Sequence, residues 1–146
     1  MKFDGSFVLS IPRSAVYEKM SNLDFLMAII PDKVEATRVD DRTIQAVIKA
    51  GLSFIKGKFR TNITVEDKVE AQSLTVRGSG SGSGSSMDFK VHISLAEDQS
   101  GTIISWNADV NISGSAATLG QRMVDKAAKN YMDRLIESFK NSLGET

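Results

Sequence analysis

The feature that most restricts the fold is an alternation of apolar and polar residues that recurs along most of the chain. Residues 3–11, 44–50, 55–65, 87–95 and 104–112 each place apolar or small residues at every second position. Successive side chains of a β-strand point to opposite faces of the sheet, so this spacing predicts half-buried strands of an antiparallel sheet. Two weaker segments, KVEATRV and EAQSLTV, bring the expected number to about seven strands.

Three segments break the alternation and predict helices. Pro12 precedes RSAVYEKM, and proline suits the first turn of a helix. Ser21 or Asn22 can cap a second helix, LDFLMAII, which Pro31 closes. Residues 115–143 predict one long helix that Gly144 stops. Its apolar stripe comprises Leu119, Met123, Ala127, Tyr131, Leu135 and Phe139.

Residues 78–86, GSGSGSGSS, have the composition of a flexible linker. The strand before them points Leu74 and Val76 inward, and the same phase places Gly78 and Gly80 on the inner face. A linker here would leave two pieces, neither of which has enough strands and helices for a closed core. We therefore predict a hairpin within a single domain spanning residues 1–146, in which the glycines leave room for a helix or a ligand.

Composition excludes several classes of protein. Eighteen basic and eighteen acidic residues give zero formal net charge, which argues against a general nucleic-acid binder. The chain has no cysteine, so disulfides and zinc–thiolate sites are excluded. The N-terminus lacks the apolar region of a secretory signal, and the longest apolar run, residues 25–30, is too short to span a bilayer. We expect a cytoplasmic protein.

Candidate catalytic residues are scarce. The inner face of the predicted sheet offers mainly Thr61 and Thr102 as polar groups, while His92, Asp88 and Asp109 fall on the outer face by their parity. No metal-binding, nucleotide-binding or nucleophile motif occurs, and the glycines at 78–84 lead into a strand instead of a helix. We expect no catalytic residue, no metal site and no cofactor, and hence no enzyme.

Four segments together resemble one family: FDGSFVLSIPRSAVYEKM, the turn IIPD, VRGSGSGSGS and, above all, WNADVNISGSAATLGQRM. The chain resembles the CoxG family of carbon monoxide dehydrogenase subunits, within the START-like (SRPBCC) helix-grip superfamily. The resemblance implies an α+β fold in which a curved antiparallel sheet grips a long C-terminal helix, with two short helices after the first strand. It also implies an accessory protein that links a molybdenum carbon monoxide dehydrogenase, or a related hydroxylase, to the membrane or to quinone.

The inner face carries the candidate ligand site. Expected cavity residues are Phe59, Thr61, Gly78, Phe89, Trp106, Ala108, Leu119, Met123 and Ala127. Each would also suit a filled core, so the residues alone leave open a cavity that takes a quinone or lipid and a protein–protein adaptor with a packed interior. The resemblance favours the cavity, because helix-grip proteins hold apolar ligands between sheet and helix. It also keeps open a START-like enzyme of the cyclase or dehydratase type.

Four apolar residues on short segments are candidates for an exposed rim around the mouth of the cavity: Phe25, Ile29, Leu52 and Phe54. Such a rim would touch a partner enzyme or a membrane, in the latter case at the inner face of the cell membrane. The basic residues Lys56, Lys58 and Arg60 would add attraction to anionic lipid. The alternatives are two apolar pairs tucked under loops and an ordinary solvated basic face.

Overall fold

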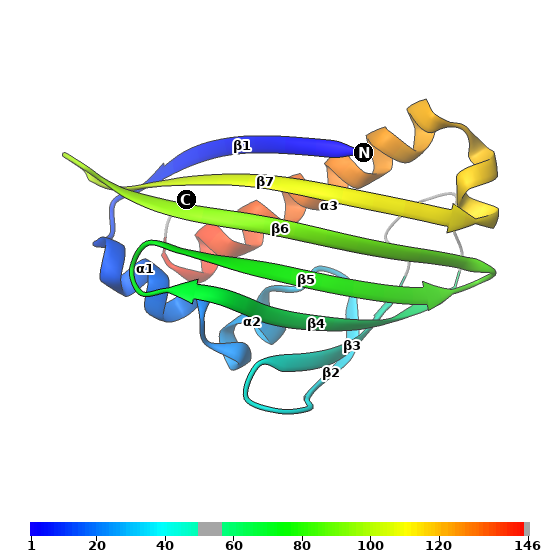
Figure 1. Ribbon diagram of the computed structural model, residues 1–146, viewed down its shortest axis with the longest axis horizontal. Helices are drawn as coiled ribbons and strands as arrows, with labels where there is room; N and C mark the ends of the chain where they lie inside the picture. Colours follow the sequence, from blue (N-terminus) through cyan, green and yellow to red (C-terminus); the bar gives the residue numbers. More distant parts are fainter. Residues whose placement is uncertain (50–56, 145–146) are drawn as a thin grey trace.

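The computed structural model describes residues 1–49 and 57–144 of the chain. In this part a curved, seven-stranded antiparallel sheet packs one face against a long C-terminal helix, α3 (Figure 1). The strands are β1 (Lys2–Leu9), β2 (Lys33–Arg38), β3 (Thr43–Lys49), β4 (Lys58–Val69), β5 (Ser73–Gly82), β6 (Ser85–Asp98) and β7 (Gly101–Gly114). The helices are α1 (Arg13–Met20), α2 (Leu23–Ile29), the 3₁₀ helix η1 (Ser115–Leu119) and α3 (Gln121–Ser142). The α+β helix-grip fold expected from the sequence is therefore confirmed.

The strand order is β1-β7-β6-β5-β4-β3-β2, so the first and last strands of the chain are neighbours (Figure 1). Phe3 lies opposite Ala108, and the N-terminal amino group of Met1 donates a hydrogen bond to the Val110 carbonyl oxygen at 2.7 Å. The inner face of the sheet, defined here as the face toward α3, carries the described apolar side chains of the alternations, such as Ile44, Phe59 and Trp106. This pairing brings residues from both ends of the sequence onto that one face.

The Gly-Ser stretch is divided between two long strands. β5 and β6 meet at a two-residue turn, Ser83–Gly84, with Gly82 directly opposite Ser85. Ser83 has φ 52° and Gly84 has φ 76°, and two central residues with positive φ produce the turn twist that suits a tight hairpin. The stretch therefore lies within the β5–β6 ladder, with its turn at residues 83 and 84.

The short helices begin where the sequence places their caps. Asn22 precedes α2, and its side-chain oxygen accepts hydrogen bonds from the backbone N–H groups of Asp24 and Phe25 at 2.9 and 3.2 Å. Pro12 occupies the position before α1. The two helices cover one end of the inner face.

The long helix is shorter at its N-terminus than the sequence predicts. Residues 115–119 form η1, and Gly120, at φ 98°, separates it from α3. Positive φ is strained for residues other than glycine, so the chain changes direction at this point. The helix proper begins at Gln121, not at residue 115.

The apolar stripe of α3 also differs from the prediction. A uniform spacing of four residues advances about 400° per step at 3.6 residues per turn, so each step drifts about 40° around the helix. Four steps back from Phe139 reach Met123, by which point the drift is roughly 160°. Met123 is accordingly 47% exposed, whereas Val124 is buried and Ala128 faces the sheet side.

The best-buried apolar residues gather where α1, α2 and the end of α3 cover the sheet. This core comprises Leu9, Val16, Tyr17, Met20, Leu23, Ile29, Ile44, Val65, Leu74, Leu95, Ile104 and Phe139. The Phe139 ring packs edge-on against Phe7 and Phe25, with ring centroids 6.3 and 5.7 Å apart. The core therefore closes one end of the space between the sheet and α3.

Candidate functional site: an apolar cavity between sheet and helix

An apolar cavity of about 330 Å³ lies between the inner face of the sheet and α3. Inward-facing residues of β1 and of β3 to β7 form one wall. On the opposite side the lining residues of α3 are Ala128, Tyr131, Met132, Leu135, Ile136 and Phe139. This volume reaches the lower end of the range found for small-molecule sites.

Five of the residues expected at a ligand site line this cavity. They are Phe59, Thr61, Phe89, Trp106 and Ala108, from β4, β6 and β7. They were identifiable because strand parity alone decides which face of the sheet a side chain occupies. The rings of Phe59, Phe89 and Trp106 supply aromatic surface of the kind that apolar ligand sites use.

Gly78 does not line the cavity, and the reason is its cross-strand neighbour. Gly78 lies directly opposite Phe89, and a Cβ atom at Gly78 would collide with the Phe89 ring. The same relationship holds between Gly5 and Trp106, where an added Cβ would lie 2.8 Å from the indole ring. The missing side chains therefore make room for aromatic rings of the cavity wall, not directly for a ligand.

Three residues expected on the helical wall lie elsewhere. Leu119 and Met123 are 41% and 47% exposed, and Ala127 is buried outside the cavity lining. Ala128, Met132 and Ile136 take their place, because steps of three, four and four residues back from Phe139 stay on the face of the helix that points to the sheet. Counting back from Phe139 with a period of 3.6 residues would have identified them in the sequence.

The polar groups around the cavity are few. None of the described residues that line it carries a formal charge, and Tyr131 is the one titratable group among them. The Tyr131 hydroxyl donates a hydrogen bond to the Pro31 carbonyl oxygen at 2.9 Å, and burial raises the pKa of this phenol. Thr61 Oγ1 is buried and has no hydrogen-bond partner in the described part of the chain.

Polar contacts hold α3 against the segment that follows α2. Arg134 binds both carboxylate oxygens of Asp32 at 2.9 Å, and Ser138 Oγ donates to the Ile29 carbonyl oxygen at 2.8 Å. The hydrogen bond from Arg134 lowers the pKa of the Asp32 carboxyl. With the Tyr131 contact, these bonds fix the C-terminal half of α3 at one end of the cavity.

The proposed exposed rim is only partly described. Ile29 is 5% exposed and lines the cavity from within, and Phe25 is half-buried against Phe139, so these two do not form an exposed apolar rim. Their position on α2, which packs inward against the core, is the reason. Leu52, Phe54 and Lys56 lie outside the described residues. Lys58 and Arg60 are exposed on the outer face.

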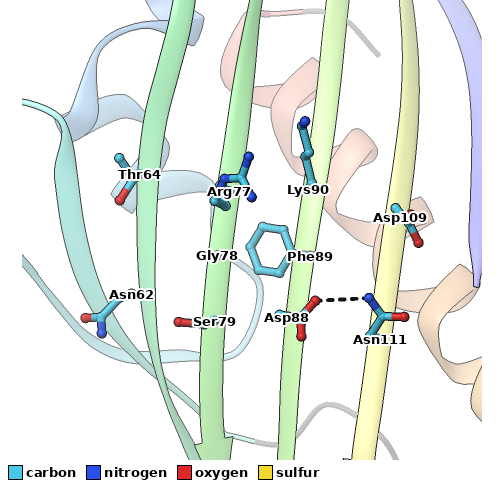
Figure 2. Close-up of a pocket in the computed structure, with 10 residues that line it drawn as sticks. All are labelled: Asn62, Thr64, Arg77, Gly78, Ser79, Asp88, Phe89, Lys90, Asp109 and Asn111. Carbon is cyan, nitrogen blue, oxygen red and sulfur yellow. Dashed lines mark hydrogen bonds between the residues drawn. The ribbon is translucent and has the colours of Figure 1, made fainter.

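A second hollow, of about 420 Å³, lies on the outer face of the sheet (Figure 2). Polar and charged side chains from four neighbouring strands line it, including Asn62, Ser79, Asp88 and Asn111. Gly78 and the Phe89 ring also border it (Figure 2). Asn111 Nδ2 donates to Asp88 Oδ1 at 3.1 Å (Figure 2). Charges of both signs are interspersed and largely exposed in this hollow, as on an ordinary solvated sheet face. We therefore assign the candidate site to the apolar cavity.

The only histidine of the sequence, His92, lies on the outer face, as its parity predicts. Its Nδ1 atom forms a 3.1 Å hydrogen bond with Thr75 Oγ1 on the adjacent strand. This position separates it from the apolar cavity by the thickness of the sheet.

A curved antiparallel sheet that closes on a C-terminal helix around an apolar cavity defines a START-like helix-grip protein. A conserved protein from Geobacillus kaustophilus has the same fold, with a TM-score of 0.90 and 19% identity over 99% of this chain and 95% of that chain. A START superfamily protein from Mycobacterium smegmatis gives a TM-score of 0.71 and 10% identity over 97% of this chain and 95% of that one. No curated protein sequence matches the chain.

The sequence matches CoxG, a family of carbon monoxide dehydrogenase subunits, over residues 5–144. The chain therefore belongs to the CoxG family. The resemblance first indicated by the strand-to-helix motif around Trp106 is thereby confirmed. Within the described residues, no helix combines the length and apolar character needed to cross a bilayer.

Proposed function

We propose that this protein is a non-enzymatic accessory protein that binds an apolar ligand, a quinone or a lipid, between its sheet and α3. It serves a molybdenum-containing carbon monoxide dehydrogenase or a related hydroxylase, by recruiting the enzyme to the membrane or by linking it to membrane quinone. Family membership supports the association with carbon monoxide dehydrogenase. The protein acts on the cytoplasmic side, as a peripheral component of the inner membrane face.

The observation that carries the ligand proposal is the apolar cavity itself. Phe59, Phe89 and Trp106 reach it from three strands, and Leu135 and Ile136 reach it from the helix. Burial of apolar surface contributes about 25 cal/mol per Å², so a flat, mostly hydrocarbon ligand would gain most of its affinity there. Protein interiors are normally close-packed, so a protein–protein adaptor with a filled core would not be expected to leave about 330 Å³ of space beside its only tryptophan.

The chemistry of the lining supports a binding role over catalysis. General acid–base catalysis needs a group whose pKa lies near the working pH. Tyr131, the one titratable residue among the described lining residues, has its pKa raised further above neutrality by burial, and its proton is engaged with Pro31. A cyclase or dehydratase mechanism therefore has no suitable proton donor or acceptor among these groups.

We place the membrane contact at the end of the cavity where η1 meets α3. Leu119 and Met123 are exposed apolar residues there, and Ala116 of the same 3₁₀ helix lines the cavity. Arg122 and Lys126 are exposed on the adjoining turns of α3 and would attract anionic headgroups. This surface replaces the Phe25 and Ile29 rim, whose side chains are turned inward.

The ligand proposal is tested with protein purified from its own host. Native mass spectrometry with solvent extraction should detect a co-purified apolar molecule, and added menaquinone-like or fatty-acyl probes should change the fluorescence of Trp106. Ala108→Leu should weaken this response because it fills the cavity, while Ala96→Leu, on an exposed position of β6, should not. A protein that carries no ligand and whose Trp106 is insensitive to every probe would contradict the proposal.

The membrane contact is tested by co-sedimentation with anionic liposomes. Burial of one large apolar side chain contributes roughly 1.5–3 kcal/mol, so Leu119→Ser/Met123→Ser should abolish a weak association. Val34→Ser/Val69→Ser is the matched control, since those residues are 50% and 47% exposed on the sheet. Equal sedimentation of both folded variants would refute this surface.

A further inference from the structure

Thr61 is the one buried polar residue whose side chain lacks a partner in the described structure. Four polar residues are buried there: Thr61, Thr75, Ser85 and Thr102. Thr75 binds His92, Ser85 Oγ accepts from the Ala116 N–H at 2.9 Å, and Thr102 Oγ1 donates to the Ile11 carbonyl oxygen at 2.6 Å. Buried polar groups are normally hydrogen-bonded, so the exception at Thr61 calls for a physical explanation.

The neighbours of Thr61 on the sheet cannot satisfy it. Thr61 is 1% exposed on the inner face of β4, directly opposite Ala46 of β3 and Gly80 of β5. Neither neighbour has a polar side chain. A Cβ atom at Gly80 would lie 2.7 Å from Thr61 Oγ1, so the absence of that side chain leaves the space in which the hydroxyl sits.

A buried hydroxyl without a hydrogen-bond partner lowers the stability of the folded protein, so a purely structural role does not explain Thr61. The inner-face residues on either side of it in β4, Phe59 and Ile63, are apolar and line the same cavity. Valine has nearly the shape of threonine and would fill the position without an unsatisfied hydroxyl. Thr61 is among the residues that line the cavity, and a change of its χ1 rotamer would move the hydroxyl to another staggered position, from which it could meet a ligand.

We propose that Thr61 supplies the hydrogen bond that orients the ligand in the cavity, and that the ligand is an uncharged apolar molecule bearing a carbonyl oxygen. This rests on the proposed ligand-binding function and specifies its chemistry. Thr61 donates its hydroxyl proton to the carbonyl, and the remaining contacts are hydrophobic.

The ligand is uncharged because the cavity offers no counter-charge. The described residues that line it include no lysine, arginine, histidine, aspartate or glutamate. A carboxylate or ammonium group would lose its hydration there without a partner, which is far more costly than the transfer of a carbonyl. The hydroxyls of Tyr131 and Ser86 are already engaged with Pro31 and Ser113, so Thr61 carries the one lining hydroxyl that lacks a partner among the described residues. The indole N–H of Trp106 is another polar hydrogen in the lining.

The test compares probes that share one ring system. Menadione carries two carbonyl oxygens, 2-methylnaphthalene has the same methylated skeleton without them, and 2-naphthoate adds a carboxylate. The chain has no cysteine, so menadione cannot be trapped as a cysteine thioether. Dissociation constants are measured by calorimetry and by Trp106 fluorescence for the parent, Thr61→Val and Thr61→Ser.

We expect the parent to bind menadione more tightly than 2-methylnaphthalene, and 2-naphthoate least tightly. Thr61→Val should weaken menadione binding roughly fivefold, the effect of one neutral hydrogen bond, and leave 2-methylnaphthalene binding unchanged. Thr61→Ser should retain menadione binding because it keeps the hydroxyl. The Thr61→Val protein should unfold at the same or a higher denaturant concentration, which shows that the loss is not a folding defect.

Three results would overturn the assignment in distinguishable ways. If the parent, Thr61→Val and Thr61→Ser bind menadione with equal affinity and also bind 2-methylnaphthalene with equal affinity, the cavity takes apolar ligands but Thr61 does not bind their carbonyl oxygen. If Thr61→Val weakens both probes alike, the residue acts through packing. If the parent binds none of the three probes, both the proposed ligand-binding function and the role of Thr61 are contradicted.

Discussion

Arg134, on the exposed side of α3, binds the Asp32 carboxylate with two hydrogen bonds of 2.9 Å and so joins two segments that lie far apart in sequence. Asp32 adopts a φ of 60° at the turn between α2 and β2, and its carbonyl oxygen accepts a hydrogen bond from the Lys49 N–H. One ion pair therefore fixes the helix to a turn that also contacts the end of β3.

Arg134→Ala should lower the free energy of unfolding by about 1 kcal/mol or less, because both partners are partly exposed to solvent. The hydrogen bond to Arg134 lowers the pKa of Asp32, so the contribution is present above the ordinary carboxyl pKa of 3.8 and is lost as the pH falls toward the folded-state value. Urea unfolding of parent and variant between neutral pH and about pH 3 measures this. Lys129→Ala, which removes an ion pair within α3, is the control, and an equal pH dependence of both variants would contradict the prediction.

Tyr131→Phe should lower the free energy of unfolding by about 0.5–1.5 kcal/mol, because the Pro31 carbonyl oxygen loses its donor. Burial raises the pKa of Tyr131 above its ordinary value of 10.0, so the unfolded chain loses this proton first. The parent should therefore lose stability as the pH rises above about 10, and the phenylalanine variant should lose less. Unfolding free energies of the parent and the variant, measured at neutral and alkaline pH, test this. An equal loss of stability with rising pH in both proteins would refute it.

Gly78→Val should lower the free energy of unfolding by about 1–3 kcal/mol, since the new side chain would collide with the Phe89 ring. Ser79→Val, on the outer face of the same strand, should change it by no more than about 0.5 kcal/mol. The cost of Gly78→Val should shrink in a Phe89→Ala background, where the ring is absent. Additive effects in this double-mutant cycle would show that the ring and the glycine are not coupled.

Phe139→Ala should lower the free energy of unfolding by about 3–5 kcal/mol, because the ring is buried between Phe7 and Phe25. Met123→Ala should change it by no more than about 0.5 kcal/mol, since this side chain is 47% exposed. Chemical denaturation of both variants tests the phase of α3. A large loss of unfolding free energy in Met123→Ala would instead support the apolar stripe that a uniform four-residue spacing predicts.

The cavity wall contributed by the sheet was predictable from the sequence to a large extent. Phe59, Phe89, Trp106 and Ala108 lie on strands whose alternation extends over many residues, and one strand carries its side chains to alternating faces regardless of its neighbours. The cap at Asn22 was predictable for the same reason, because a helix cap involves only the next few residues. Local periodicity and local hydrogen bonding carry this information.

The helical wall was less predictable. Met123 and Ala127 fit a uniform four-residue spacing, and Ala128 and Met132 fit the orientation that the helix adopts, so the sequence alone does not choose between the two sets. In addition, Gly120 interrupts the segment that the sequence presents as one continuous helix. A small angular error per turn accumulates along a helix, so its distant end cannot be oriented from one anchor without an accurate period. Packing against the sheet decides the orientation.

The strands, their inner and outer faces, the caps of the short helices and the family all follow from the order of the residues along the chain. What fills the space beside the glycines follows only from the pairing of strands: the register of β5 against β6 places Phe89 over Gly78, and that of β4 against β5 places Thr61 beside Gly80. Packing likewise decides that Arg134 meets Asp32 and that Thr61 remains without a partner in the described structure. Parity is a property of one strand, whereas these contacts depend on how distant segments align, and no local pattern records that alignment.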